Sequence, residues 1–338
     1  MAWNPSTSND VIGYRVAYVI TSAANTRSLD VGNATTATVS GLDDSTTYSF
    51  AVTAYNKDGV VSFPSNQVTV NPARIANLST RVGVGNFSHV LINGFIIGGS
   101  DQKTVVLRAV GPSLAQFGVP GVMADPVLKL YDATGALIAE NDNWRDSQEA
   151  AFAENGPFHG VQPSSDLESA IAITLPPGSY TTILSGKNST TGVALAELYD
   201  YSPDANAKLS NISARAFVGG GDNVLIGGVT VDGVGSVSRS APLVLRAIGP
   251  SLAEYGITDP LYDPTLAVYD SNGTLLAFND DWSDDPNQAG QIMASGFAPK
   301  SALESAIFAL LPAGNYTAIV RGWNGTQGVA LFDAYQLP

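Results

Sequence analysis

The chain has 338 residues, with 16 Lys and Arg against 30 Asp and Glu, so its formal net charge at pH 7 is −14. A chain this acidic lacks the basic surface on which nucleic acid binding depends, so we expect no nucleic acid partner. It contains no Cys and two His, which excludes thiol catalysis, disulfide bonds and zinc sites built from those residues. Hydrophobic residues make up 44% and charged residues 14%, as in folded proteins, and the length predicts two or three domains.

The sequence contains no run of about 18 apolar residues, so we expect no insertion into a membrane. Its first ten residues also lack the basic start and apolar stretch of a secretory signal. We expect the protein to be secreted or displayed on the cell surface, with a signal upstream of the sequence given, because of the modules that follow.

Residues 1–73 predict short strands joined by tight turns. Four segments are rich in β-branched and aromatic residues or alternate with a period of two: 11–20, 35–39, 48–55 and 61–70. Clusters of turn-forming residues separate them, including Asp43-Asp44-Ser45 and Asn56-Lys57-Asp58-Gly59. This spacing predicts an antiparallel β-sandwich.

Particular residues make this segment resemble a fibronectin type III domain: Trp3, Pro5, Gly13-Tyr14-Arg15-Val16, Gly41-Leu42, Thr47-Tyr48, Val52, Ala54, Asn56, Gly59, Ser62 and Ser65. Leu42 and Tyr48 match the tyrosine corner of such sandwiches. In that family the Trp ends the second strand, so the resemblance implies that the first strand and most of the second are missing. Either those strands lie upstream, or another subunit supplies them by β-strand complementation and a polymer forms.

The rest of the chain is one unit present twice, in residues 74–203 and 208–338, with an offset of about 134 to 138 positions. Four pairs of stretches carry the repeat: 107–115 with 245–253, 141–144 with 279–282, 167–171 with 303–307, and 175–181 with 311–317. Linkers are expected at 71–73 and 203–206. A period of this length indicates duplicated domains.

Each copy predicts a series of strands, at 90–97, 104–110, 127–131, 170–174, 180–185 and 193–199 in the first and at 224–231, 243–248, 265–269, 306–310, 316–321 and 329–335 in the second. Hairpin turns are indicated at 133–135 and 271–273. Short helices are indicated by a capping box at 146–149 and by the Asp285-Pro286 pair. We predict an all-β protein with a fibronectin III-like sandwich followed by two tandem jelly-roll-like antiparallel β-sandwiches.

The stretches 269–281 and 311–320, with their counterparts in the first copy, resemble a repeat of large secreted proteins of environmental bacteria such as Verrucomicrobia. More loosely, they are similar to bacterial pre-peptidase carboxy-terminal domains. The resemblance implies a non-catalytic accessory sandwich of an exported protein, and in some cases calcium binding.

Acidic loops are the candidate metal sites, because Ca²⁺ prefers six to eight oxygen ligands. The second copy offers Asp280, Asp281, Asp284, Asp285 and Glu304, and the first copy offers a thinner set of Asp142, Asn143, Asp146 and Glu168. The alternative is structural, with Asn279-Asp280 forming a side-chain-bonded turn and Asp146 and Asp285 capping short helices. No EF-hand spacing is present.

Aromatic and basic residues are the other candidates. Trp144 and Trp282 occupy equivalent positions, where core packing competes with sugar stacking, while Trp323 lies on a predicted turn and is the candidate glycan platform. Arg108 and Arg246 are expected in buried ion pairs, with Asp125 and Asp263 or Glu168 and Glu304 as partners.

The sequence favours no enzyme. The two His are not equivalent between the copies, and no nucleophile elbow or phosphate-binding loop is present. We therefore predict a non-catalytic extracellular structural or adhesive protein or fibre subunit that assembles with itself. The alternative is a carbohydrate-binding accessory region of a secreted polysaccharide-degrading enzyme.

Overall fold

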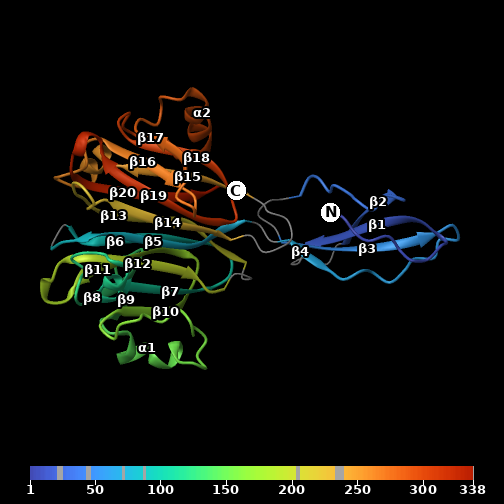
Figure 1. Cartoon of the computed structure of the whole chain (residues 1–338), viewed down its shortest axis with the longest axis horizontal. Helices are drawn as coiled ribbons and strands as arrows, with labels where there is room; N and C mark the ends of the chain where they lie inside the picture. Colours follow the sequence, from blue (N-terminus) through green and yellow to red (C-terminus); the bar gives the residue numbers. More distant parts are fainter. Residues whose placement is uncertain are drawn as a thin grey trace. The chain divides into compact units, whose positions relative to one another are not determined.

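The computed structural model describes residues 1–20, 26–42, 47–70, 73–86, 89–202, 206–232 and 240–337. They divide into two compact units, one made chiefly of residues 1–73 and one of residues 74–231 and 241–337 (Figure 1). Almost all regular structure is antiparallel β, which confirms the predicted fold class. The predicted turn at 43–45 and most of the linkers at 71–73 and 203–206 lie outside the described residues.

The first unit contains one four-stranded sheet in the order β2-β1-β3-β4. Its strands are β1 (Val11–Ile20), β2 (Thr26–Gly32), β3 (Tyr48–Asn56) and β4 (Val68–Val70). The prediction for β1 has the observed bounds and that for β3 is one residue short, whereas β2 was missed. The strand predicted at 35–39 is reduced to an isolated bridge between Ala2 and Thr36, and the one predicted at 61–70 pairs in β4 only from Val68.

One face of this sheet carries the core of the first unit. Val16, Tyr48, Phe50 and Val70 are buried, and Trp3 and Leu42 are among the half-buried side chains that pack on them. Alternation along β1 and β3 places these apolar side chains on the same face, as expected for a half-buried strand. Opposite them, the chain near Trp3 is held by backbone hydrogen bonds such as that from Trp3 N to Thr35 O, at 3.0 Å.

The second unit contains the two repeats, each with eight strands. The strands of repeat 1 are β5 (Arg74–Val84), β6 (Leu91–Gly99), β7 (Lys103–Val110), β8 (Pro126–Asp132), β9 (Leu137–Asn141), β10 (Ser169–Leu175), β11 (Gly178–Gly186) and β12 (Gly192–Asp200). Those of repeat 2 are β13 (Ala207–Val218), β14 (Leu225–Asp232), β15 (Ser240–Ile248), β16 (Pro264–Tyr269), β17 (Leu275–Asn279), β18 (Ser305–Pro312), β19 (Gly314–Gly322) and β20 (Gly328–Gln336).

Both repeats contribute to each of the two sheets of this unit. One sheet runs β10-β7-β12-β5-β14-β19-β16-β17 and the other β18-β15-β20-β13-β6-β11-β8-β9. The repeats therefore meet where β5 pairs with β14 and where β13 pairs with β6, in the middle of the unit (Figure 1). The two predicted sandwiches are fused side by side through hydrogen-bonded strands, and the limits 74–203 and 208–338 stay a prediction about the sequence repeat.

The alternating pattern of β13 shows how these strands serve both faces of their sheet. Leu209, Ile212 and Ala214 are buried in the interior, whereas Ser213 and Arg215 are only partly buried on the outer face. A period of two is the pattern of a strand with one face in the core. The outer face of the seam thus carries the polar side chains of β13 next to apolar ones of β6 such as Ile92 and Ile96.

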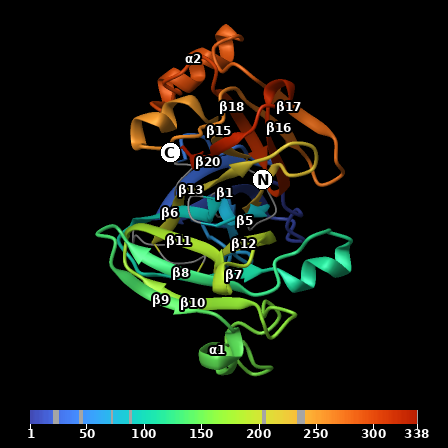
Figure 2. The same cartoon turned by 90° about the vertical axis from the view of Figure 1, so that its left-hand side faces the viewer.

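Two short helices lie at opposite ends of the repeat unit, α1 (Trp144–Phe152) in repeat 1 and α2 (Pro286–Ser295) in repeat 2 (Figures 1 and 2). Asp285 caps α2 by accepting from the backbone N–H groups of Asn287 and Gln288, with Pro286 in the first turn, as predicted. The capping box predicted at 146–149 is wrong, because α1 already begins at Trp144 and Asp146 falls within its first turn.

At the seam between β6 and β13, a side chain at Gly94 would displace that of Ser213. A Cβ atom there would lie 2.7 Å from Ser213 Oγ, and Gly228 faces Ser79 in the equivalent way on the other seam. We expect Gly94→Val to lower the free energy of unfolding by about 1–3 kcal/mol, since overpacked sites shift their neighbours. Gly83→Val, where a Cβ meets nothing within 4 Å, is the control. Equal urea midpoints for the two variants would contradict the close contact between Gly94 and Ser213.

Candidate functional site

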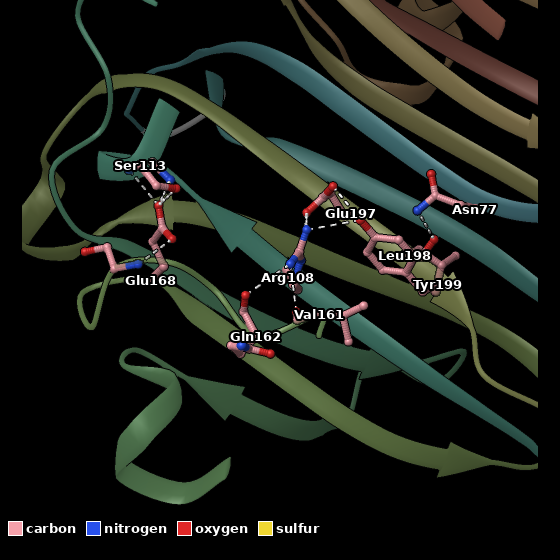
Figure 3. Close-up of polar contacts among 11 residues, drawn as sticks. Asn77, Arg108, Ser113, Val161, Gln162, Glu168, Glu197, Leu198 and Tyr199 are labelled. Carbon is pink, nitrogen blue, oxygen red and sulfur yellow. Dashed lines mark hydrogen bonds and ion pairs between the residues drawn. The ribbon is translucent and has the colours of Figure 1, made fainter. Parts of the chain in front are cut away.

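A buried glutamate recurs in both repeats and binds the chain's own backbone. Glu168 precedes β10 and is fully buried, and its Oε1 accepts from Gly111 N at 3.0 Å, from Ser113 N at 2.9 Å and from Ser113 Oγ at 2.6 Å (Figure 3). Its Oε2 accepts from Ser165 N at 3.2 Å. The carboxylate therefore ties the turn after β7 to the loop before β10.

Glu304 does the same in repeat 2. It is fully buried and accepts from Gly249 N at 3.1 Å, from Ser251 N at 3.0 Å and from the Ser251 hydroxyl, while Ser301 N donates to its other oxygen at 3.2 Å. A carboxylate with several backbone N–H partners is stabilised without a cation. The contacts of both glutamates are those of a structural acceptor, although the sequence had suggested them as calcium ligands.

The predicted ion pair of Arg108 is present, but its predicted partners are wrong. The guanidinium binds Glu197, which lies directly opposite on β12, and Nη1 donates to Val161 O at 2.7 Å (Figure 3). The Tyr199 hydroxyl accepts from Arg108 Nη2 at 3.0 Å and donates to Glu197 at 2.8 Å. Burial, with the nearby Glu197 charge, raises the pKa of Tyr199.

Repeat 2 repeats this arrangement with Arg246, Asp333 and Tyr335. Arg246 Nε and Nη2 donate to the two Asp333 oxygens at 2.9 and 2.7 Å, and Nη1 donates to Phe297 O at 2.9 Å. Burial raises the pKa of Asp333 more than Arg246 lowers it. The sequence analysis did not identify Glu197 and Asp333 as the partners. Their acidic character at equivalent positions of the two repeats could have indicated them.

In repeat 1, a lysine lies among the acidic side chains of the predicted metal loop. Lys187 Nζ forms an ion pair with Asp142 and lies 3.8 Å from Asp125 Oδ2. Burial and the neighbouring Asp142 raise the pKa of Asp125, and Lys187 opposes this shift. Asn143 donates to Asp146 at 3.2 Å instead of facing this group. The ammonium thus supplies a positive charge where a cation had been predicted.

Repeat 2 has no such charge, because Trp323 occupies the position of Lys187. Trp323 N donates to Asp263 O at 2.8 Å, as Lys187 N does to Asp125 O. Burial and the Asp280 charge raise the pKa of Asp263, while burial and the charges of Asp284, Asp280 and Asp263 raise that of Asp281. The carboxylates of this loop repel one another, whereas in repeat 1 the ammonium of Lys187 compensates that repulsion.

Several of the nine predicted metal ligands have partners within the chain. Glu168 and Glu304 bind backbone groups, Asp285 caps α2, and Asp142 pairs with Lys187. Over the described ranges, no three acidic or histidine side chains form a group that could hold a metal ion. Calcium binding stays a prediction, and the group of Asp280, Asp281 and Asp284 is where it would be tested.

The uncompensated carboxyls of repeat 2 give the chain a predictable response to pH. Because the pKa values of Asp263 and Asp281 are raised on folding, their stabilising contribution is complete below the ordinary value of 3.8 and is lost as the pH rises through the folded values. We expect Trp323→Lys to raise the urea midpoint at pH 7 more than at pH 4. Lys187→Trp should lower it at pH 7, and identical effects at both pH values would contradict this reasoning.

The four Trp side chains differ in their surroundings. Trp144 is buried and packs on Phe152, and Trp144 Nε1 donates to Ser165 O at 3.1 Å. Trp282 Nε1 donates to Ser301 O at the same distance. These contacts favour core packing for Trp144, whereas Trp282 is half-buried and its role stays a prediction; Trp323, in the short 3-10 helix η5 (Trp323–Gly325), is 44% exposed.

The two histidines do not share a site in the described part of the chain. His89 forms a contact of 2.9 Å with Asp259 and stacks on Phe217, so it links the repeats. His159 is exposed in the loop after α1. Neither arrangement contains a nucleophile held by a histidine.

Comparisons with known proteins place a fibronectin type III domain at the start of the chain. Residues 1–71 match the family model of that domain, a non-catalytic module typical of extracellular proteins. The chain is also 39% identical over 84 residues to a Kelch domain-containing protein of Saccharolobus solfataricus, a match over 25% of this chain and 11% of that protein. The chain thus spans about a tenth of the length of that curated relative, so nothing of its role is carried over.

Among solved structures, that of infectious bursal disease virus, Gt strain, covers 99% of this chain and 64% of the viral chain, with 9% identity and a TM-score of 0.16. That score carries no argument about the fold. Across the described residues, no helix has the length and apolar character that a membrane crossing needs. The fold and the family match together define an all-β chain that carries an extracellular structural or binding module.

Proposed function

We propose that the chain is a non-catalytic structural or adhesive part of a secreted or cell-surface protein. The fusion of the two repeats through both of their sheets is the observation that carries this proposal. Hydrogen-bonded seams at two places make the repeat pair a stiff connecting element, since neither repeat can rotate without breaking strand pairs. A stiff pair beside a fibronectin type III domain suits a protein that holds or spaces other parts.

The duplicated polar side chains support the same proposal. Glu168 and Glu304 fix loops, and Arg108 and Arg246 pair across neighbouring strands. Each of these groups has its partners within the chain, so it is committed to stability.

The adhesive proposal includes assembly of copies through the fibronectin type III sheet, whose edge strands are β2 and β4. An edge strand offers unpaired backbone groups to an incoming strand. Light scattering of the full chain over a range of concentrations, with electron microscopy, tests this step. We expect concentration-dependent oligomers or fibres, and monomers at every concentration would remove the fibre version.

A carbohydrate-binding accessory region is the second candidate, favoured by the exposure of Trp323. An aromatic ring presented on a turn can stack on a sugar. In pull-down with insoluble polysaccharides, we expect retention of the wild-type chain and loss on Trp323→Ala. Phe278→Ala, at a residue 53% exposed on β17, is the matched control. No retention on any polysaccharide would remove this candidate.

A further inference from the structure

A groove crosses the seam between the repeats on the outer face of the sheet that contains β13 and β6. Its volume is about 490 Å³, within the range of small-molecule sites. Repeat 1 contributes Thr181 from β11, and repeat 2 contributes Ser213 and Arg215 from β13. The 3-10 helix η4 (Pro250–Tyr255) and the loop at 298–300 complete the wall. The groove therefore exists only because the two repeats share this sheet.

Three cationic side chains line the groove in a chain whose net charge is −14. Arg246 is committed to Asp333, and Lys300 pairs with Glu254 at 2.5 Å, where both side chains are more than half exposed. Exposed pairs of this kind contribute little and can be exchanged. Arg215 differs, because among the described residues no group forms an ion pair or hydrogen bond with its guanidinium, although its backbone pairs with β20 and β6.

An unpaired, partly buried guanidinium such as that of Arg215 is stabilised when an anion binds it. Guanidinium binds carboxylate through two parallel hydrogen bonds, and partial burial strengthens such a pair relative to one in water. Lys300 also lines the groove and adds positive charge when its exposed pair with Glu254 is exchanged, while the buried Asp333 is bound to Arg246. The electrostatics of the groove therefore favour a ligand that carries a carboxylate.

The strand pairing indicates what kind of molecule carries that carboxylate. β13 is hydrogen-bonded to β20 on one side and to β6 on the other, so the sheet has no free edge here. A peptide could not extend the sheet, which is the usual way a strand is recognised. The wall instead offers the hydroxyl of Thr181, apolar side chains such as Ile248, and the ring of Tyr255, which is 71% exposed. A hydroxyl and an aromatic ring match the polar edges and apolar faces of sugars.

We propose that this groove binds an acidic oligosaccharide, with Arg215 pairing a uronate carboxylate and Tyr255 stacking on a sugar ring. The site is separate from Trp323, which does not line the groove, and it does not depend on the role proposed above. Repeat 1 provides an internal comparison. Arg81 on β5 is the counterpart of Arg215, but Phe117 and Ser164 stand where repeat 2 has Tyr255 and Lys300.

Titration calorimetry of the full chain with tetragalacturonate tests the proposal, with maltotetraose as the neutral saccharide and hexaglutamate as the acidic peptide. We expect binding of tetragalacturonate that weakens with added salt, and no heat from maltotetraose. Arg215→Ala should weaken binding by about tenfold to a hundredfold, the loss expected for a charge-assisted pair. Arg81→Ala is the matched control and should bind as the wild type does.

Several outcomes would overturn this assignment. No heat from tetragalacturonate with the wild-type chain would remove the site, and equal weakening by Arg81→Ala and Arg215→Ala would reduce it to general charge attraction. Equal or tighter binding of hexaglutamate would assign the groove to an acidic peptide. Tyr255→Ala tests the stacking role separately, because this exposed side chain can be removed without unfolding the chain. Unchanged affinity of Tyr255→Ala for tetragalacturonate would contradict stacking.

Discussion

Replacing Lys103 by Ala is expected to lower the free energy of unfolding of the repeat unit by about 3–5 kcal/mol, because the change strands a buried carboxylate. Lys103 Nζ donates to the two Asp200 oxygens at 2.9 and 2.7 Å and to Ser202 O at 3.2 Å. The lysine side chain is fully buried and that of Asp200 is 1% exposed. Burial lowers the pKa of Lys103, and the Asp200 charge opposes this shift.

Repeat 2 shows how the same place can be filled without charges. Ala241 and Gln336 stand at the positions of Lys103 and Asp200, and Gln336 Oε1 accepts from Ile75 N at 2.9 Å. We therefore expect Lys103→Ala/Asp200→Gln to recover at least half of the loss, since a neutral pair leaves no buried charge. Urea unfolding followed by tryptophan fluorescence measures both variants. A double variant as unstable as Lys103→Ala would show that lost packing outweighs the stranded charge.

The repeat in the sequence made most strands predictable, but it concealed how the copies join. The predicted segments 104–110 and 243–248 correspond to β7 and β15. They could be recognised because both are strongly apolar. β5 and β13 were missed, since Ser, Asn and Arg alternate with their apolar residues, and the short strands β9 and β17 were missed as well. Each seam joins one of β5 and β13 to a strand of the other repeat. A pattern of burial along one strand cannot show which distant edge it pairs with.

Side-chain partners were less predictable than strands for the same reason. The need of Arg108 for a carboxylate followed from its place among apolar residues, whereas Glu197 became its partner through the register of β7 and β12. Similarly, Asp142 was recognisable as part of an acidic loop, but neither its neighbour Asp125 nor the compensating Lys187, which comes from a distant turn, was predicted to lie beside it. Composition indicates which groups need partners, and only the pairing of strands determines which partners they find.

The equivalent positions of the repeats fall into two groups that separate stability from recognition. One inner network is alike, with Arg108 and Arg246 each bound to a carboxylate across a strand pair, whereas the buried ion pair of Lys103 is found in repeat 1 and a neutral pair takes its place in repeat 2. The outer positions differ, since repeat 2 has Trp323 at the position that Lys187 occupies in repeat 1. The arginine network that fixes neighbouring strands is thus common to both repeats, while an exposed position differs in charge and aromatic character. The surface of repeat 2 is therefore where binding should be sought.

Glu168→Ala and Glu304→Ala form the second large prediction, with a loss of about 3–5 kcal/mol each in the free energy of unfolding. Removal of the Glu168 carboxylate leaves the N–H groups of Gly111, Ser113 and Ser165 without their acceptor, and each unpaired buried donor costs about 1–3 kcal/mol. Glu168→Gln keeps one acceptor oxygen and should lose less. Glu140→Ala, at a half-exposed residue paired with Lys129, is the control, with a change of about 0.5 kcal/mol or less.

The same variants decide between the two roles that the sequence left open for these glutamates. If Glu168 and Glu304 act as backbone acceptors, their replacement costs the same free energy with calcium as with chelator, because no ion takes part. If either holds calcium, the wild-type chain gains stability from the ion by mass action and the variant does not. Urea unfolding of the wild-type, Glu168→Ala and Glu304→Ala chains with millimolar calcium and with chelator measures this difference. A wild-type gain in calcium that disappears in either variant would contradict the structural role.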